Sequence, residues 1–300
     1  MNTKPKIISV WYPGCAKWCD KCLGKGHEWY NCPIRQFSQP GLSWANRVSK
    51  QQLELPDPQW VPQWSPECLE NIKDKDGCLP SDRYNNEVLS GKTQINKQSQ
   101  IIPFYSNHPE YSYLSNHAPF PVTIDGETFR YTEEHLMMTK ARMMGELDAV
   151  DAMKNARTPG EIKQIGDGLF WPAGQRQWNV TAFNLLYASN LKKYQQHQQL
   201  RKKFFSTVGN RLVEANPHLS IWGAGISYKN EDVRDPKKWK QGCRNLFGDL
   251  LTLLRSDMYR MQEFQKETNE VFNTNILNRC NVFVRERSGS GTILRSSSTK

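Results

Sequence analysis

A cysteine-rich cluster near the start of the chain has the composition and spacing of a metal site. It follows the pattern C-x2-C-x4-H-x4-C, with candidate ligands at Cys19, Cys22, His27 and Cys32. Three thiolates and one imidazole complete the tetrahedral shell that Zn²⁺ prefers in structural sites. Because four protein ligands leave no position for water, the sequence predicts a structural zinc ion whose binding drives the folding of residues 15–33.

The same segment resembles the retroviral-type zinc knuckle at every ligand and at the Gly26-His27 pair. It departs from that knuckle at Asp20, where an aromatic residue is common. Trp18 and Trp29 flank the ligands and can stack on unpaired bases. The resemblance therefore implies single-stranded nucleic acid as a partner. The alternative is a knuckle used only for protein contact or as a folding staple.

A second set of residues that suggests chemistry lies between residues 104 and 248. Its polar and aromatic strings run in the order FYSNHPEYSYLSNHAPF, TEEHLMMTKA, RTPGEIKQIG, LVEANPHLSIWGAG and RNLFGDLL. Taken in order, they resemble the NADAR family, the YbiA-like domain named for its association with NAD and ADP-ribose chemistry. From Trp178 through Lys193 to Thr207 the family's spacing is kept, and Tyr194 replaces the usual Phe.

Members of that family are N-glycosidases. Bacterial members cut the bond between ribose and a base-like amine in riboflavin-pathway intermediates, and others remove ADP-ribose from modified guanine. Such cleavage passes through an oxocarbenium-like state, which needs a carboxylate, a proton donor for the leaving nitrogen and a dry wall beside the ring. The resemblance thus implies an N-glycosidase for an ADP-ribosylated nucleobase or a related ribosyl nucleotide.

The resemblance assigns the catalytic carboxylate to Glu133 or Glu134 and a cationic partner to Lys140. In the family, a Glu is commonly followed seven residues later by a Lys, which places both side chains on one helix face. The string EHLMM makes Glu134 the equivalent, whereas the spacing pairs Glu133 with Lys140. Glu134 is the preferred assignment. Lys140 is expected to attack the opened ribose as a Schiff-base amine, or simply to bind phosphate.

Two tryptophans are expected to wall the pocket. Trp178 and Trp222 match family tryptophans and would lie against base or ribose, although large aromatic residues also make ordinary core. Gly223 beside Trp222 would let a ligand approach the backbone closely.

Four polar residues are also expected to bind the ligand. Arg244 and Asn245 stand at the start of the last predicted helix, where a helix N-terminus and a nearby Arg can hold a pyrophosphate. Ser115 and Asn116 match the family's SN pair and would hydrogen-bond ribose. The alternatives are an ordinary helix cap and a turn former.

Some positions depart from the family pattern. Ser220 stands for the usual Asp, His117 for Phe, Asp167 for Arg, and Cys243 for Gly. If Ser220 and Asp167 remove a charged pair that family members have, the activity of the pocket is weakened or its specificity is changed. The alternative function is therefore a zinc-dependent protein whose degenerate pocket binds ADP-ribose or nucleic acid without turnover.

Hydrophobic period and turn chemistry predict the elements that must position these residues. The string FPVTIDGETFRY alternates around Asp125-Gly126 and predicts a hairpin. A helix is predicted from Thr132, which is expected to cap its N-terminus. Further helices are predicted over 148–156, 158–165, 177–196 and 200–206, and from Asn245. The apolar face of the longest helix is predicted at Val180, Phe183, Tyr187, Leu191 and Tyr194.

These elements predict an α-rich α+β domain with one small sheet over residues 101–257, and the resemblance implies a YbiA-like fold. Residues 34–100 are predicted to be a Pro/Gln-rich linker, because proline removes backbone donors and blocks helices. Tryptophans in that range would dock on a neighbouring surface or bind a ligand. Residues 258–300 form a tail that is predicted to be partly disordered.

The overall composition limits the partners. A formal net charge of +10 favours anionic partners such as nucleic acid. No apolar run approaches the ~18 residues of a membrane span, and no secretory signal is apparent, so an intracellular protein, cytoplasmic or nuclear, without a membrane partner is expected. The cysteines are expected to be thiols in a reducing compartment rather than disulfides.

Overall fold

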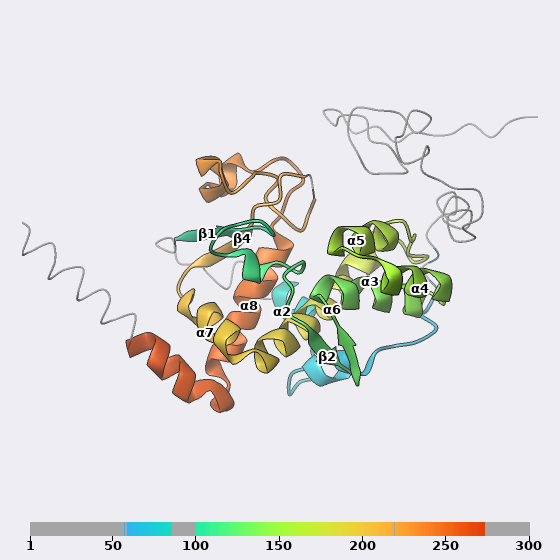
Figure 1. Cartoon of the computed structure of the whole chain (residues 1–300), viewed down its shortest axis with the longest axis horizontal. Helices are drawn as coiled ribbons and strands as arrows, with labels where there is room; N and C mark the ends of the chain where they lie inside the picture. The colour runs from blue at the N-terminus through green and yellow to red at the C-terminus, as the bar shows by residue number, and fades with distance from the viewer. Residues whose placement is uncertain (1–56, 58, 86–99, 219, 274–300) are drawn as a thin grey trace, which may run out of the picture.

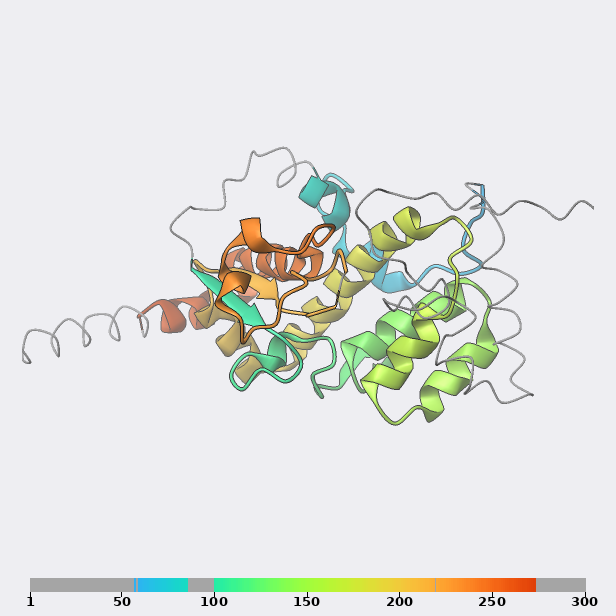
Figure 2. The same ribbon diagram turned by 90° about the horizontal axis from the view of Figure 1, so that it is seen from above.

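The computed structural model describes residues 57, 59–85, 100–218 and 220–273 of the chain. The predicted zinc site at residues 15–33 lies outside the described residues. The long helix α6 (Gln175–Gln196) runs through the middle of the domain, as Figures 1 and 2 show. Residues 122–167 lie on one side of it, and the strands and helices of residues 101–104 and 198–260 lie mainly on the other.

Helix α6 is buried on nearly all sides. Residues 182–190 are all buried, because α3 (Thr132–Met143), α7 (Gln198–Ser206) and α8 (Leu246–Arg260) pack around them. A helix covered on all sides has no single apolar face. The predicted apolar face was therefore incomplete, and it was wrong at Val180, which is 43% exposed near the start of the helix.

The hairpin prediction is confirmed. Strands β2 (Val122–Ile124) and β3 (Glu127–Phe129) pair antiparallel on either side of a two-residue turn. Asp125 and Gly126 adopt φ values of 49° and 82°, as a type I′ turn requires.

Helices α4 (Leu147–Asn155) and α5 (Pro159–Asp167) lie close to their predicted positions. Thr158 caps α5 by accepting a hydrogen bond from the Glu161 amide. The predicted cap of α3 was wrong, because Thr132 is already the first helical residue. Its hydroxyl instead donates to the side-chain oxygen of Asn116 at 2.9 Å.

A second small sheet was not predicted. Strands β1 (Ile101–Phe104) and β4 (Arg211–Glu214) pair in parallel, so the described residues contain two two-stranded sheets rather than one. Both strands are short, and Pro103 lies within β1, which weakens the strand signal of the sequence. Residues 215–245 leave β4 as a loop with short 3-10 turns η6 (Glu231–Arg234) and η7 (Pro236–Lys238).

Part of the range predicted to be a linker packs into the domain. The 3-10 segment η3 (Glu67–Ile72) and the short helix α2 (Pro80–Tyr84) both lie against α6. The Ser81 amide donates to the Asn184 side chain at 3.0 Å. Trp60 packs edge-on against Trp171, with ring centroids 4.8 Å apart. Residues 57–85 therefore bury enough apolar surface to form part of the folded unit.

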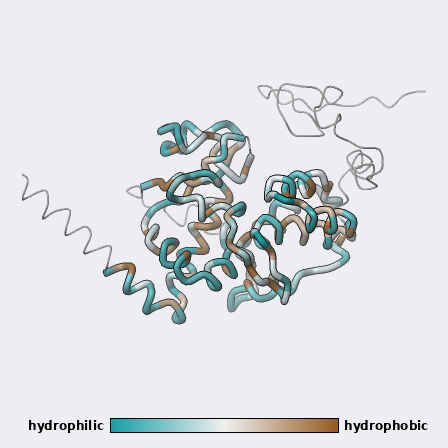
Figure 3. The backbone as a smooth tube through the Cα atoms, in the orientation of Figure 1, coloured by the Kyte–Doolittle hydropathy of each residue, from teal (hydrophilic) through white to brown (hydrophobic). Residues whose placement is uncertain are grey.

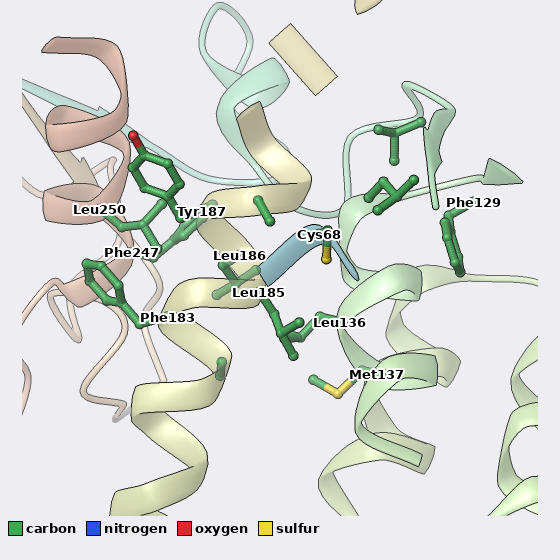
Figure 4. Close-up of a cluster of buried hydrophobic side chains, with 14 of the residues drawn as sticks. Cys68, Phe129, Leu136, Met137, Phe183, Leu185, Leu186, Tyr187, Phe247 and Leu250 are labelled. Carbon is green, nitrogen blue, oxygen red and sulfur yellow. The ribbon is translucent and has the colours of Figure 1, made fainter. Parts of the chain in front are cut away.

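One continuous core connects these parts. Figure 3 shows apolar residues along the inward faces of the helices and polar residues outside. Figure 4 shows buried Cys68 of η3 between Leu136 of α3 and Leu186 of α6, while Phe247 and Leu250 of α8 pack on the other side of α6. A smaller cluster under the 215–245 loop contains Val213, Ala224 and Val233. The 3-10 turn η5 (Ser112–Leu114) follows β1, and residues 265–273 after the 3-10 turn η8 (Gln262–Phe264) are helical, with Glu267 paired to Arg201 of α7 at 2.7 Å.

Candidate active site

The two parallel strands β1 and β4 end at the same edge of their sheet. Phe104 of β1 pairs with Glu214 of β4, so both strands end at the same edge and Tyr105 follows there. Burial and the charge of Glu214 raise the pKa of Tyr105, while Lys163 of α5 opposes them. Tyr105 after β1, Glu214 of β4 and Lys163 of α5 therefore lie near enough to influence one another electrostatically at this edge.

Glu133 is the buried carboxylate of this region. It lies in the first turn of α3 with only 5% of its surface exposed. Its Oε2 is 3.9 Å from His117 Nε2, and its Oε1 is 3.8 Å from Lys163 Nζ. Within the described part of the chain, Oε1 has no hydrogen-bond partner. A buried carboxylate with an unused oxygen can accept a ligand or stabilise positive charge.

Lys163 supplies the positive charge of the cluster. Its Nζ is 3.1 Å from the carboxylate of Asp167, one turn later on α5, and its side chain is 44% exposed. Desolvation lowers the pKa of Lys163, but the charges of Glu133 and Asp167 outweigh it and raise the pKa above its ordinary value. Lys163 therefore acts as a cation and not as a neutral amine.

Glu214 supplies a second carboxyl group of different character. Desolvation by the surrounding protein and the charge of Glu133 raise its pKa to about 8, against the opposing effect of Lys163. At neutral pH this group is mostly protonated and can donate a proton. Two carboxyl groups in distinct environments are the usual basis of acid and base roles in glycoside hydrolysis.

Glu134 lies beside Glu133 in sequence but has structural partners. Its Oε1 accepts from Arg130 Nε at 2.9 Å, and its Oε2 accepts from the Arg130 backbone amide at 2.6 Å. The same guanidinium donates to the carbonyls of Met153 and Ala156. The Arg130–Glu134 ion pair therefore connects the hairpin to α3 and to the end of α4. The hydrogen bonds of Glu134 hold these elements together.

Comparison with known proteins places these residues in a family. The NADAR domain matches residues 103–259, just over half of the chain. The chain belongs to the NADAR family. The matched range includes Tyr105, Glu133, Lys163 and Glu214, so the whole charged cluster lies within the NADAR domain.

Individual relatives are distant. Protein irg-1 of Caenorhabditis elegans is 26% identical over 155 residues, covering 51% of this chain and 72% of that protein. N-glycosidase YbiA of Escherichia coli strain K12 is 27% identical over 138 residues, covering 46% of this chain and 84% of its own. The solution structure of E. coli YbiA covers 54% of this chain and 86% of its own, at 22% identity and a TM-score of 0.42.

Lys140 and Trp178 lie inside the NADAR domain. Lys140 Nζ donates to the carbonyls of Gly166 and Leu169, at 2.8 and 2.7 Å, and lies 4.8 Å from the centroid of the Trp178 ring. Burial lowers the pKa of Lys140 to about 8, although Asp167 opposes the shift. Trp178 is 6% exposed and packs against Trp171. Both predicted site residues thus join α3 to α6 and to the end of α5.

Ser115 and Asn116 lie next to Glu133. The Asn116 carbonyl accepts from the Glu133 amide at 3.2 Å, and its side-chain oxygen accepts from the Thr132 hydroxyl. The buried Ser115 hydroxyl accepts from the His117 amide at 3.1 Å. The structure therefore brings this predicted pair to the candidate site, where it supports the carboxylate.

Trp222 and Gly223 lie on the 215–245 loop. Trp222 is partly buried, and its amide donates to the Ser220 hydroxyl at 3.2 Å. A Cβ on Gly223 would come within 2.9 Å of the Glu214 carbonyl oxygen. The glycine accordingly lets two backbone segments approach each other beside Glu214.

Arg244 and Asn245 differ in exposure. Arg244 is exposed, whereas Asn245 is fully buried with φ 56°. Its side chain accepts from the Glu214 amide at 2.8 Å and donates to the Leu212 carbonyl at 3.0 Å. Asn245 thus fixes the end of β4 against α8, and its polar atoms already have partners inside the protein.

The described residues also limit what else the domain contains. No group of three or more His, Cys, Asp or Glu residues within them could hold a metal ion, and the four predicted zinc ligands lie outside them. No helix in the same residues is long and apolar enough to cross a membrane.

Sequence reasoning missed Lys163, Glu214 and Tyr105 as site residues. All three lie in or beside the strings that carried the family resemblance. No spacing within one element connects them, because they come from α5, β4 and the end of β1. Only the family pattern offered a signal for them.

Proposed function

We propose that this chain is an N-glycosidase that cleaves the ribosyl C–N bond of ADP-ribosylated nucleobases or related ribosyl nucleotides. Relatives named N-glycosidase support the glycosidase class. The observation that carries the proposal is the buried Glu133 carboxylate, which has one oxygen unpartnered among the described residues and lies 3.8 Å from Lys163 Nζ and 3.9 Å from His117 Nε2.

In the proposed reaction, Glu214 donates its proton to the leaving nitrogen as the C–N bond breaks. The electron pair of that bond departs with the nitrogen, and the Glu133 carboxylate stabilises the positive charge on the ribosyl carbon. Water then attacks this carbon, and Glu133 accepts its proton. Glu133 passes that proton to solvent and Glu214 regains one, so the products are the free base and ADP-ribose.

Lys163 and Trp222 have binding roles in this proposal. The half-exposed ammonium of Lys163, 3.8 Å from Glu133 Oε1, would contact a phosphate of the ADP-ribose group. Trp222, on the loop after Glu214, would form a wall beside the base or ribose. Glu133 replaces Glu134 as the proposed carboxylate because Glu134 is held by Arg130.

We further propose that residues 15–33 bind zinc through Cys19, Cys22, His27 and Cys32 and present single-stranded nucleic acid to the NADAR domain. The net charge of +10 and the flanking tryptophans favour this partner. The proposed zinc is structural and takes no part in the cleavage.

The test follows ADP-ribose release from guanine-ADP-ribosylated single-stranded DNA by the purified chain. Wild type is expected to release ADP-ribose, and Glu133→Gln to bind the substrate with similar affinity but without turnover. No release by wild type beside an active NADAR control would refute the proposal. Tight binding by both proteins without product would instead support the binding-protein alternative, which Ser220 and Asp167 motivate.

A variant that lacks residues 1–56 separates nucleic-acid substrates from small ones. The deletion stops before residue 57 because residues 57–85 pack into the domain. If the knuckle presents DNA, the deletion should raise KM for the modified strand and leave cleavage of a free ADP-ribosylated nucleoside unchanged. Equal rates on both substrates would contradict a presenting role.

A further inference from the structure

The segment of residues 113–117, here called the 113–117 loop, forms one side of the candidate site. Asn116 accepts the Glu133 amide and the Thr132 hydroxyl, and His117 Nε2 lies 3.9 Å from the Glu133 carboxylate. The position of this loop therefore determines what Glu133 contacts.

Lys193 of α6 holds the loop from inside the protein. Its side chain is only 1% exposed, and its Nζ donates to the carbonyls of Tyr113 and Ser115 at 2.7 and 3.1 Å. The rings of Phe120 and Tyr194 lie 5.8 and 5.4 Å from the same nitrogen. Within the described residues, no carboxylate forms an ion pair with Lys193, which is an unusual setting for an ammonium group.

Asn190, one turn earlier on α6, is hydrogen-bonded to the same loop. Its Nδ2 donates to the side-chain oxygen of Asn116 at 3.0 Å and to the Leu186 carbonyl at 2.9 Å. Asn190 has no exposed surface. Two buried polar residues of α6, three positions apart, therefore hold the segment that leads to Glu133 and His117.

This arrangement is costly for stability alone. Burial lowers the pKa of Lys193 to about 7, which reflects the price of desolvating its charge. An apolar side chain of similar length would avoid that cost but would remove the donor that the Tyr113 and Ser115 carbonyls share, so the ammonium is explained by the geometry it imposes on these two carbonyls.

We propose that Lys193 and Asn190 are positioning residues that hold the 113–117 loop and thereby set the orientation of Glu133 and His117 for cleavage. Neither touches the substrate. The kinetic part of this inference rests on the proposed N-glycosidase function, and the structural part does not.

The main experiment compares Lys193→Met with Arg255→Met. Arg255 is a matched control, because it is also buried and donates to backbone carbonyls, those of Thr207 and Asn210 in another loop. Hydrogen exchange of the Glu133 amide is measured first. We expect it to rise at least about tenfold in Lys193→Met and to stay unchanged in Arg255→Met.

Kinetics on the modified DNA follow for variants that remain folded. Displacing the carboxylate by a fraction of an ångström to 1 Å should lower kcat by about 10- to 100-fold with little change in KM. Asn190→Ala, a milder change, should give the same pattern with a smaller effect. Unchanged Glu133 exchange in both Lys193→Met and Asn190→Ala would overturn the proposal.

The exchange measurement also separates this inference from the function. If wild type releases no ADP-ribose but Lys193→Met still speeds hydrogen exchange of the Glu133 amide, the positioning role is supported and the N-glycosidase proposal is refuted. If wild type is active and both variants keep full kcat, the positioning role fails and the reaction stands. Should Lys193→Met not fold, Asn190→Ala alone decides by the same criteria.

Discussion

The two ends of helix α3 differ in how completely their buried charged side chains are hydrogen-bonded. At its start, Glu133 lies 3.8 Å from the Lys163 ammonium and 3.9 Å from the His117 ring, and its Oε1 has no hydrogen bond among the described residues. At its end, Lys140 donates two short hydrogen bonds to carbonyls and lies over an aromatic ring.

This difference distinguishes a residue that could act on a ligand, Glu133, from one that stabilises the fold, Lys140. A buried charge with complete hydrogen bonding holds elements together, and its surroundings leave no capacity for a ligand. A buried charge with incomplete bonding lowers stability unless a substrate completes it, and such groups concentrate at functional sites. In the proposed function, the start of α3 is therefore the end that acts on the substrate.

The largest expected effect comes from comparing neighbouring carboxylates. Glu133→Gln should lower kcat by about 10³-fold, because the charge that stabilises the transition state is lost. Its free energy of unfolding should change by less than about 1 kcal/mol, because Lys163 keeps its ion pair with Asp167 when the Glu133 charge is lost. Urea titration and single-turnover kinetics on the same samples test both statements.

Glu134→Gln should show the reverse. Losing the charge that pairs with Arg130 should cost about 2 kcal/mol of stability, while kcat of the folded fraction should change less than about threefold. A stable Glu134→Gln protein without turnover would restore Glu134 as the catalytic carboxylate.

The next effect concerns Lys140. Lys140→Met should lower the free energy of unfolding by about 2 kcal/mol, and so Tm by roughly 4–8 °C, because two buried carbonyls lose their donor. Calorimetry measures the shift. If this variant keeps its Tm but loses a borohydride-trappable adduct with ADP-ribose, the Schiff-base role expected from the family would be correct.

A smaller effect is expected from pH. Because the folded pKa of Glu214 is raised from 4.5 to about 8, its contribution to stability is present below pH 4.5 and is lost as pH rises toward 8. The acid form is needed for protonating the leaving nitrogen, so kcat should also fall above about pH 8. Glu214→Gln should flatten the stability profile between these limits. An identical pH slope in both proteins would show that Glu214 is not the titrating group.

Local features of the fold could be predicted from sequence, and non-local ones could not. The Asp125-Gly126 hairpin and the start of α5 near residue 158 depend on residues within a few positions of one another. The β1–β4 pair joins segments more than 100 residues apart and contains Pro103, so no local pattern marks it.

The candidate site shows the same limit. Family spacing located the Glu133-Glu134 pair, but which carboxylate faces the site depends on where Arg130 and Lys163 come to lie. Those positions follow from packing α4 and α5 against α3, which no spacing along one helix encodes. The incomplete bonding of Glu133 became visible only once these elements were assembled.

The smallest expected effect concerns the apolar face that the sequence predicted for α6. Val180 was predicted in the apolar face, yet it is 43% exposed, so Val180→Lys should change the free energy of unfolding by less than about 0.5 kcal/mol. Phe183, three residues later and 4% exposed, is the matched position, and Phe183→Ala should cost about 3–5 kcal/mol. Urea midpoints of both variants measure the contrast. A loss above 2 kcal/mol in Val180→Lys would mean that the start of α6 is covered, either by residues outside the described ranges or by a second molecule.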